Sequence, residues 1–435
     1  MKCYVGVDLG STTSKAVVLG SDGEIIGRGI TNSRSNYDVA VDIARSEAFI
    51  EARFNLLGGR LRRIPELSGL ADRIVGALDK ELRVSQYTFQ LDCLEEALLD
   101  VADPAAEHGV LKDVVASMRE AIPGHFRFNR RKTGFFRGLA TSDYMGRAQD
   151  ISKSGGPSFD RMANLFDKSI IQVENRGLDL SFEANIGGPM EIVIKRFADR
   201  VGEGVATMRQ ALESAVAEDL EVASSVGTGY GRARLPFDKD CIRSEILCHG
   251  LGAHRMFPET RTVLDIGGQD TKAIQVDGDG IVTSFQMNDR CAAGCGRYLG
   301  YIADEMNLGV HELGPLASSS DRPTRINSTC TVFAGAELRD RLTMGQKRED
   351  ILAGLHRAII LRAMSLLARS GGVKDELTFT GGVANNAAAV SALETLVHEN
   401  YGEVTLNISP DSIYTGALGA ATFAQRGDEF EEVAA

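Results

Sequence analysis

Two stretches of the chain carry the same residue types that bind a phosphate group. The first reads Asp8-Leu-Gly-Ser-Thr-Thr-Ser-Lys15, and the second reads Asp265-Ile-Gly-Gly-Gln-Asp-Thr-Lys272. A glycine turn lets an anion approach backbone N–H groups, and small hydroxyl side chains complete such a site. The aspartate that opens each stretch suits Mg²⁺, which keeps several water ligands and takes few carboxylates. Each stretch is therefore a candidate phosphate-binding turn.

The two stretches are copies of one pattern. A constant shift of 257 positions places Asp8 on Asp265, Gly10 on Gly267 and Lys15 on Lys272, and each copy continues through an apolar strand to an Asp-Gly turn. A repeat that holds one register over this length predicts two similar domains that face each other and offer a hairpin to the same ligand. We assign a catalytic role to Asp8 and Asp265. The predicted nucleotide-binding residues are Gly10, Ser11, Thr12, Thr13 and Lys15 in the first copy and Gly267, Gly268, Gln269 and Lys272 in the second.

The elements that must position these turns follow from hydrophobic periodicity. Residues 262–266 read as a buried strand that runs into the second turn, whereas segments such as 91–101 carry apolar residues at helical spacing. Residues 311–325 read as a polar loop. These patterns predict a first domain made of residues 1–30 and 201–258, a mostly helical insertion over 31–200, and a second domain over 259–435.

Two further motifs complete a candidate nucleotide site. A strand over 377–380 runs into Gly381-Gly-Val-Ala-Asn-Asn386, where Gly381 and Gly382 let backbone lie flat against a planar base and Asn385 offers hydrogen bonds. Glu245, at the start of a predicted helix, is a candidate for orienting the attacking water, with a surface glutamate as the equal alternative. The glycine loop over 227–232 does not have its third glycine at the spacing of a dinucleotide fingerprint, so this signal is weak.

Cys291 and Cys330 each lie just before a predicted helix. A helix N-terminus favours the thiolate and a negatively charged cluster, so we interpret both cysteines as metal ligands rather than as packed side chains. Two ligands cannot complete a four-cysteine iron–sulfur site, so a cluster would be shared with a second, related chain. Cys295 is a third candidate sulfur, which we interpret as a bystander.

Composition limits the other possibilities. The chain has 435 residues, a net charge of −12 and seven cysteines, and its first residues lack the apolar region of a signal peptide. The charge argues against nucleic acid or an anionic membrane as a partner, and the cysteine usage predicts a reducing cytoplasm. Residues 125–137 interleave cations with phenylalanines, for which a half-buried surface is favoured over an RNA site, with docking of an acidic protein as a third option.

At these motifs the chain resembles the BadF/BadG/BcrA/BcrD ATPase family, within the superfamily of acetate and sugar kinases, heat-shock chaperone ATPases and actin. The matching stretches are D-L-G-S-T-T-S-K, T-G-Y-G-R, D-I-G-G-Q-D-T-K, N-D-R-C-A-A-G-C-G-R, S-T-C-T-V-F-A and T-G-G-V-A-N-N. The resemblance implies an α/β fold, a duplicated ribonuclease-H-like ATPase with ATP and Mg²⁺ in the cleft. It also implies that Cys291 and Cys330 hold one [4Fe–4S] cluster between two subunits, so that ATP hydrolysis drives a low-potential electron into a partner enzyme.

The resemblance extends to the partners. The length of the chain resembles that of the larger ATPase subunit of benzoyl-CoA reductase, which implies a shorter homologous ATPase subunit, two substrate-binding reductase subunits and ferredoxin as the electron donor. Two departures from the short homodimeric activases of 2-hydroxyacyl-CoA dehydratases are the long insertion and Cys295, where those activases generally have threonine. An activase of such a dehydratase and a non-redox kinase of the same superfamily are the alternatives.

Overall fold

The computed structural model describes residues 1–33, 36–126, 136–288, 295–306, 308–326 and 331–434. The chain divides into two compact units. One consists of residues 26–221 together with Met1, and the other consists of residues 2–25 and 222–435. All residues assigned to the nucleotide site belong to the second unit.

The first phosphate turn connects two strands of a four-stranded sheet. Strands β1 (Lys2–Leu9) and β2 (Thr13–Gly20) are antiparallel, and with β3 (Ile25–Asn32) and β4 (Glu221–Thr228) the order is β3-β2-β1-β4. Nearly every side chain of β1 is buried, as expected for a strand that is covered on both faces. Helix α16 (Thr415–Ala434) packs against β1 through small residues such as Ala417 and Ala421.

The second phosphate turn connects two strands of a five-stranded sheet. Its strands are β5 (Thr260–Ile266), β6 (Thr271–Val276), β7 (Val282–Asn288), β8 (Glu376–Thr380) and β9 (Leu406–Ile408), in the order β7-β6-β5-β8-β9. β5 pairs antiparallel with β6 and parallel with β8. The carboxyl ends of β5 and β8 therefore meet at one edge of the sheet, where both lead into glycine-containing turns.

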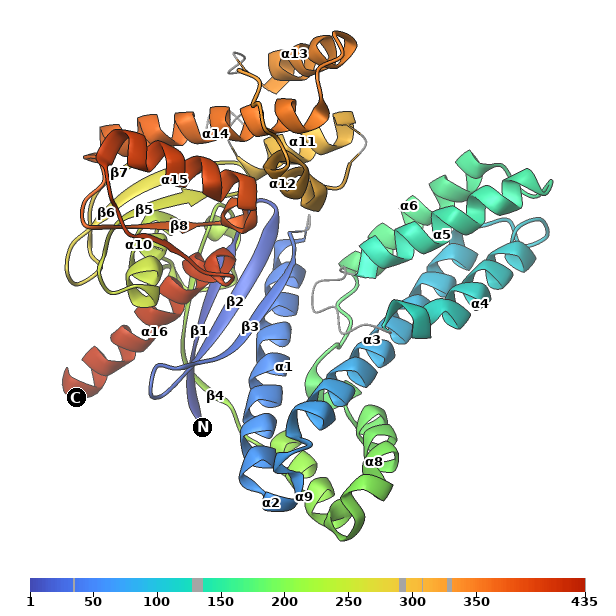
Figure 1. The fold of residues 1–435 in the computed structure, drawn as a ribbon. Helices are drawn as coiled ribbons and strands as arrows, with labels where there is room; N and C mark the ends of the chain where they lie inside the picture. Colours follow the sequence, from blue (N-terminus) through green and yellow to red (C-terminus); the bar gives the residue numbers. More distant parts are fainter. Residues whose placement is uncertain (34–35, 127–135, 289–294, 307, 327–330, 435) are drawn as a thin grey trace. The chain divides into compact units, whose positions relative to one another are not determined.

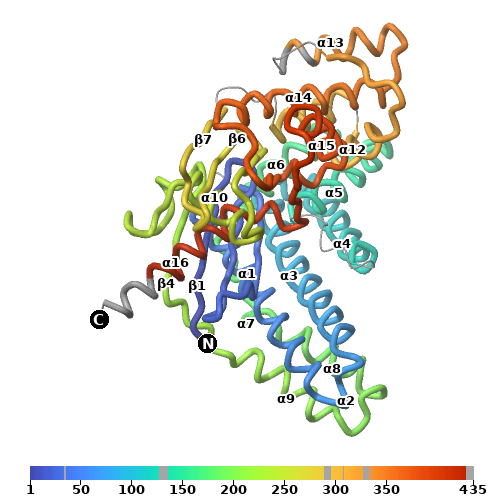
Figure 2. Tube along the Cα trace, turned by 60° about the vertical axis from the view of Figure 1, so that its left-hand side comes forward, coloured from blue at the N-terminus to red at the C-terminus, as the bar shows by residue number. Residues whose placement is uncertain are grey.

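Helices α10 (Glu245–Met256) and α14 (Arg348–Ser370) pack directly against this second sheet (Figures 1 and 2). The other helices of this part of the chain are α11 (Gly296–Met306), α12 (Val310–Ser318), α13 (Thr331–Thr343) and α15 (Ala387–Tyr401). Leu355, Phe379 and Leu393 belong to the core that joins α14, β8 and α15. The prediction of a loop over 311–325 was wrong in its first half, because Leu313 and Ala317 are buried in that core as part of α12.

Helix α14 is the one described helix that is long and apolar enough to cross a membrane by length and composition. Of its most apolar window, 61% is buried inside the protein. Its apolar residues therefore serve the core between the sheet and α15, as in the central helix of a globular domain.

Apart from strand β3, the other unit is built from helices. They are α1 (Tyr37–Arg63), α2 (Pro65–Ser68), α3 (Ala71–Val101), α4 (His108–His125), α5 (Phe136–Lys153), α6 (Phe159–Asn175), α7 (Phe182–Asn185), α8 (Gly187–Val201) and α9 (Val205–Val216). The two halves of α3 belong to two separate cores, of which one includes Leu91, Leu94 and Leu98. The division of the chain into two ribonuclease-H-like domains and an insertion remains a prediction.

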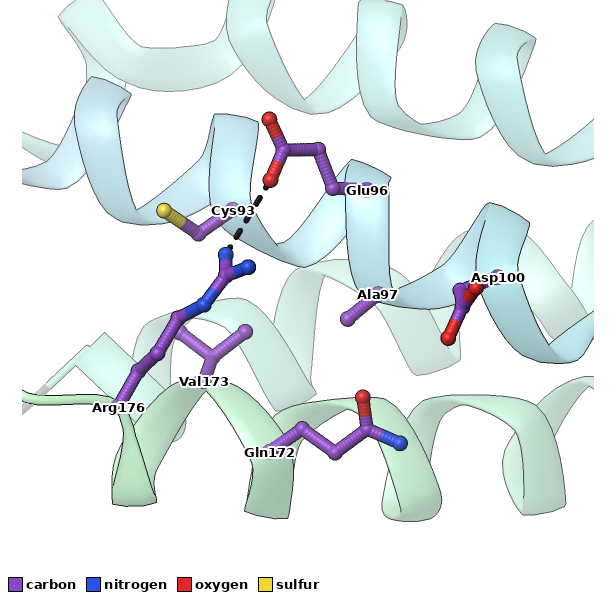
Figure 3. A pocket seen from close by; sticks show the side chains of 7 residues that line it. All are labelled: Cys93, Glu96, Ala97, Asp100, Gln172, Val173 and Arg176. Carbon is purple, nitrogen blue, oxygen red and sulfur yellow. Dashed lines mark hydrogen bonds and ion pairs between the residues drawn. The ribbon is translucent and has the colours of Figure 1, made fainter.

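A pocket lies between α3 and α6 of this helical unit (Figure 3). Its volume is about 290 Å³, and Arg176 Nη1 forms an ion pair across it with Glu96 Oε2 at 3.2 Å. The lining residues are Cys93, Glu96, Ala97, Asp100, Gln172, Val173 and Arg176. None of them belongs to the predicted nucleotide or metal sites.

Candidate nucleotide site

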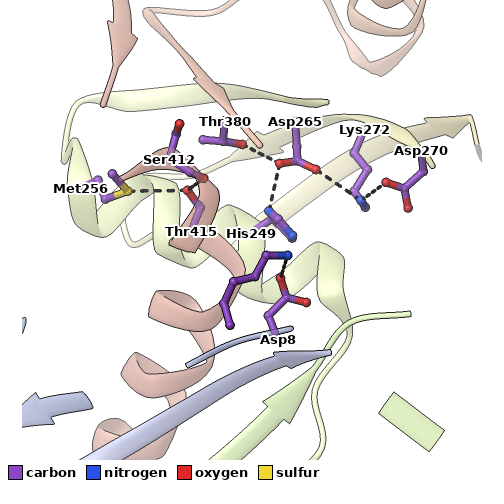
Figure 4. Close-up of polar contacts among 10 residues, drawn as sticks. Asp8, His249, Met256, Asp265, Asp270, Lys272, Thr380, Ser412 and Thr415 are labelled. Carbon is purple, nitrogen blue, oxygen red and sulfur yellow. Dashed lines mark hydrogen bonds and ion pairs between the residues drawn. The ribbon is translucent and has the colours of Figure 1, made fainter. Parts of the chain in front are cut away.

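The two hairpins place an aspartate and a lysine at the same register. Asp8 is the direct cross-strand partner of Lys15, and Asp265 is the partner of Lys272. Lys15 Nζ lies 3.1 Å from Asp8 Oδ2, and Lys272 Nζ lies 3.3 Å from Asp265 Oδ2 (Figure 4). The repeat in the sequence is therefore a repeat of one strand pairing. In each copy the lysine lies beside the aspartate that is its cross-strand partner.

The second pair is the more deeply buried of the two. The side chains of Asp265 and Lys272 are 1% and 3% exposed, and Lys272 Nζ also lies 2.7 Å from Asp270 Oδ1. Burial by itself raises the pKa of Asp265, but the neighbouring His249 and Lys272 outweigh burial and hold that pKa well below its usual range. Burial likewise lowers the pKa of Lys272, and Asp265 and Asp270 more than reverse this effect.

His249 lies between the two aspartates. Its Nδ1 is 3.3 Å from Asp265 Oδ1, a distance and alignment that make an ion pair rather than a well-directed hydrogen bond. A Cβ placed on Gly416, at the start of α16, would lie 2.9 Å from His249 Nε2 and 3.1 Å from Asp8 Oδ2. Burial lowers the pKa of His249, whereas the Asp265 carboxylate raises it by more.

His249 was missing from the residues predicted from the sequence. It follows Glu245 by four residues on α10, and residues with that spacing share one face of a helix. This spacing was the signal by which the sequence could have pointed to His249. It places His249 on the same helix face as Glu245, the candidate for orienting the attacking water. Its neighbour Cys248 instead packs among apolar side chains, where burial raises the pKa of the thiol to about 12.

The two phosphate turns face each other. A Cβ on Gly268 would lie 2.3 Å from Thr12 Oγ1 and 3.7 Å from Ser11 Oγ, so only a glycine allows this approach. Gly10, Ser11 and Thr12 form the connection between β1 and β2, at which Thr13 begins β2, and Gly267, Gly268 and Gln269 lie between β5 and β6. These six residues thus lie in two adjacent connections, and the other assigned residues, Thr13, Lys15 and Lys272, follow on β2 and β6.

Replacing Gly268 by alanine is expected to raise the Kd for Mg·ATP about tenfold, because the new methyl group pushes Thr12 out of the first turn at a cost of about 1–3 kcal/mol. Calorimetric titration with ATP measures the change. Gly278→Ala is the matched control, since a Cβ there has only Arg261 Nη2 within 4 Å, at 3.8 Å. Equal affinities for the two variants would contradict the contact between the turns.

Glu245 is the first residue of α10 and is buried. Burial raises the pKa of its carboxyl group, and Lys272 opposes this shift. Asp270, His249 and Asp8 also act electrostatically on Glu245. The carboxylate of Glu245 is therefore buried within electrostatic range of charged groups from both hairpins rather than on an open surface.

The glycine turn after β8 is tied to the second aspartate. Thr380 Oγ1 donates a hydrogen bond to Asp265 Oδ1 at 2.9 Å. Gly381 has φ +86°, and a Cβ there would lie 2.3 Å from the Ile266 carbonyl oxygen. Gly382 and Asn385 are exposed on this turn, whereas Asn386 caps α15. Of the three residues predicted to contact a base, Gly382 and Asn385 are thus accessible to a ligand, whereas Gly381 is buried against Ile266.

The glycine loop after β4 also belongs to this site. A Cβ on Gly229 would lie 2.5 Å from Asp8 Oδ1, and Gly231 N–H donates to the Leu9 carbonyl oxygen at 3.1 Å. Sequence reasoning considered this loop only as a dinucleotide motif and missed its contact with the first aspartate. Nothing in its local residues points to that contact.

The second turn is joined to the start of α11. Gly296 N–H donates to the Gly267 carbonyl oxygen, and Arg297 N–H donates to the Gly268 carbonyl oxygen, both at 2.8 Å. The first N–H groups of a helix have no partner within the helix, so here the phosphate turn supplies their acceptors. The second turn and the start of α11 are therefore joined by two backbone hydrogen bonds.

Both predicted metal ligands, Cys291 and Cys330, lie outside the described residues. Cys295 is 1% exposed and belongs to the core with Tyr298 and Leu299. Among the residues that the structure describes, no group of three or more histidine, cysteine, aspartate or glutamate side chains is arranged to hold a metal ion.

A model of the BadF/BadG/BcrA/BcrD ATPase family matches residues 5–424. The chain belongs to that family. Family membership supports an ATP-dependent enzyme that binds ATP, and it agrees with the resemblance seen in the motifs.

Two relatives of this family ATPase are a dehydratase-activating ATPase and a reductase subunit. The (R)-2-hydroxyglutaryl-CoA dehydratase activating ATPase of Acidaminococcus fermentans is 42% identical over 240 residues, which are 54% of this chain and 89% of the relative. A subunit of the benzoyl-CoA reductase of Thauera aromatica is 32% identical over 205 residues, which are 47% of this chain and 71% of the relative. The matches to both relatives thus involve about half of this chain.

A solved structure establishes the fold. The crystal structure of the Acidaminococcus fermentans (R)-2-hydroxyglutaryl-CoA dehydratase component A superposes on this family ATPase with a TM-score of 0.56 and 24% identity, covering 99% of this chain and 100% of that chain. The predicted α/β ATPase fold is confirmed.

Proposed function

We propose that this family ATPase hydrolyses Mg·ATP between its two phosphate turns and uses the energy to drive low-potential, one-electron transfer into a partner enzyme. The observation that carries the coupling is the pair of hydrogen bonds from Gly296 and Arg297 to the second turn. They connect the site of hydrolysis to the helix that follows Cys291 in the sequence.

The roles of the nucleotide-site residues follow from their chemistry. Asp8 and Asp265 hold Mg²⁺ through water, and Lys15 and Lys272 neutralise phosphate oxygens once they leave the carboxylates with which they pair in the structure. The exposed Gly382 and Asn385 contact the nucleoside. Glu245 orients the attacking water, a role that suits a buried carboxylate with a raised pKa.

Cys291 and Cys330 are our proposed ligands for half of a [4Fe–4S] cluster, and the other half belongs to a homologous subunit. This part rests on the two cysteines before helices in the sequence and on the family motifs around them. When bound, the cluster accepts and passes on single electrons. Cys295 is not among the proposed ligands, because its side chain is buried in the core.

Two classes of electron acceptor fit the chain. Identity of 42% to a dehydratase activating ATPase, against 32% to a benzoyl-CoA reductase subunit, favours a 2-hydroxyacyl-CoA dehydratase. The length of 435 residues favours the predicted role as the larger ATPase subunit of benzoyl-CoA reductase, with its shorter homologue, two substrate-binding subunits and ferredoxin. In both cases the proposed location is the cytoplasm.

Purification of the full chain under strict anoxia tests the proposal. We expect iron and sulfide in the protein, ATP hydrolysis, and copurification of an acyl-CoA dehydratase or reductase, whose identity decides between the two acceptors. An iron-free protein that transfers phosphate to a sugar or carboxylate would overturn the redox function in favour of a kinase.

Replacing Glu245 by glutamine is expected to lower kcat for ATP hydrolysis by about 10²–10⁴-fold with little change in the Kd for Mg·ATP, because the base is lost but the shape is kept. In the wild type, kcat falls as the pH drops through the pKa of Glu245, which burial places above that of an ordinary glutamate. Steady-state ATPase rates against pH measure both effects. Glu259→Gln, in the loop before β5, is the control. An unchanged acidic limb in the Glu245 variant would contradict the assignment.

A further inference from the structure

His356 of α14 is a buried titratable group that the proposed reaction does not use. Its side chain is 1% exposed, and both ring nitrogens have partners. Nδ1 lies 2.7 Å from the Leu352 carbonyl oxygen, and Nε2 lies 3.0 Å from Nδ2 of Asn386. Asn386 closes the glycine turn that we assign to the nucleoside. His356 therefore contacts that turn from its buried side, through the side chain of Asn386.

The partners of His356 determine its protonation. A carbonyl oxygen only accepts hydrogen bonds, so Nδ1 carries the proton. The orientation of the Asn386 amide is fixed by its oxygen, which accepts from Ala388 N–H at 3.0 Å and Ala389 N–H at 3.2 Å at the start of α15. The amide nitrogen therefore donates to Nε2, which must be unprotonated. The ring is neutral, and every polar atom in this chain of contacts is satisfied.

Asn386 transmits this support to the turn. Its backbone N–H donates to the Val383 carbonyl oxygen at 2.9 Å, which closes the single helical turn over Gly382–Asn385. Its side-chain oxygen lies over Gly314 of α12, where a Cβ would come within 2.9 Å of it. The exposed Asn385 is the preceding residue. The position of the turn that carries Asn385 is thus fixed at both ends. At one end Gly381 packs against Asp265, and at the other end Asn386 is hydrogen-bonded to His356.

We propose that His356 is a positioning residue for nucleotide binding, which acts through Asn386 and does so only while its imidazole is neutral. The inference rests on the proposed function, because it takes the turn over Gly381–Asn386 as the nucleoside site. Protonation at Nε2 would set two N–H donors against each other, release the amide of Asn386 and loosen the turn. The site therefore loses affinity for nucleotide when this one imidazole gains a proton.

Within the part of the chain that the structure describes, no charged group compensates such a proton. Burial is the main cause of the lowered pKa of His356, and the Leu352 carbonyl opposes it. Four charged side chains on the packed elements have other partners: Glu312 of α12 with Gly309 N–H, Glu337 of α13 with Arg341, Glu399 of α15 with Arg357, and Lys272 of β6 with Asp265. The remaining acidic and basic side chains on α12, α13 and α15 are exposed, namely His311, Arg339, Asp340, Glu394 and His398. Strand β7 contains no charged residue.

The test is the affinity of the full chain for Mg·ADP, measured by calorimetry between about pH 5 and pH 8. We expect the wild type to lose about threefold to tenfold affinity towards acidic pH, the value of one hydrogen bond. His356→Gln places an amide oxygen near the position of Nε2 and cannot be protonated. It should keep the neutral-pH affinity and lack this loss. Subtracting the two profiles removes the titration of the nucleotide itself.

Two further variants keep the test decisive. His356→Phe keeps the bulk but removes the acceptor, so its affinity should be low at every pH. Asn386→Asp keeps the cap of α15 but presents an acceptor to Nε2, so it favours the protonated ring and should bind best on the acidic side. If the affinity for Mg·ADP depends on pH in the same way for the wild type, His356→Gln and Asn386→Asp, the inference about His356 is overturned but the proposed function is not. Failure of the wild type to bind Mg·ADP at any pH would overturn the proposed function with it.

Discussion

Replacing Asp265 by asparagine is expected to lower the free energy of unfolding by about 3–5 kcal/mol, because it removes the buried carboxylate that both Lys272 and His249 face and leaves Lys272 with only the more exposed Asp270. Lys272 is 3% exposed and loses a partner at 3.3 Å, while His249 loses the charge at 3.3 Å from its Nδ1. Urea unfolding at neutral pH measures the change. The same variant should lack ATP hydrolysis, since it also removes the negative charge that we propose for holding Mg²⁺ through water.

Asp270→Asn is the matched control for this prediction. Asp270 contacts the same Lys272 nitrogen at 2.7 Å, but its side chain is 15% exposed and its loss leaves Asp265 in place. We expect a cost of about 1–2 kcal/mol for this control. Adding Lys272→Met to Asp265→Asn should recover part of the lost stability, since it removes the stranded cation. Equal costs for the two single variants, with no recovery in the double variant, would show that charge burial does not govern this pair.

Replacing either Cys291 or Cys330 by serine is expected to abolish ATP-driven electron transfer to the partner enzyme, because a hydroxyl group is a poor substitute for a thiolate ligand of iron. Iron content after anoxic purification should fall to the background level. The ATPase site lies on other residues, so Mg·ATP should still bind with an affinity within about threefold of the wild type, a difference below about 1 kcal/mol.

Cys241→Ser is the control for the cysteine variants. Cys241 is half-buried in the short helical turn over Lys239–Cys241 and belongs to neither predicted site. It should retain full iron content and electron transfer. Retention of iron in the Cys291 and Cys330 variants would remove these two residues as ligands. Cys295→Ser is less informative, because that side chain is packed in the core.

The fold class and the family could be predicted from the sequence because both depend on local patterns. The repeat from Asp8 to Lys15 and from Asp265 to Lys272 encodes one strand, one turn and one further strand, and each copy forms the same cross-strand pair in the structure. Apolar residues at helical spacing also located the helical face with Leu91, Leu94 and Leu98. The interpretation of 311–325 as a loop failed because α12 is short and its two core contacts, Leu313 and Ala317, are set among polar residues.

The sequence alone determined the candidate groups for the proposed chemistry: two aspartate–lysine turns, a glycine turn that ends in asparagines, and two cysteines before helices. It also determined the family. Only the tertiary structure decided which groups meet, because such contacts join residues that are distant in the chain. His249 beside Asp265, Gly229 against Asp8, Gly268 against Thr12 and the N–H groups of α11 on the second turn are all of this kind. These contacts arise when separate elements pack together, and no local pattern of residues predicts them.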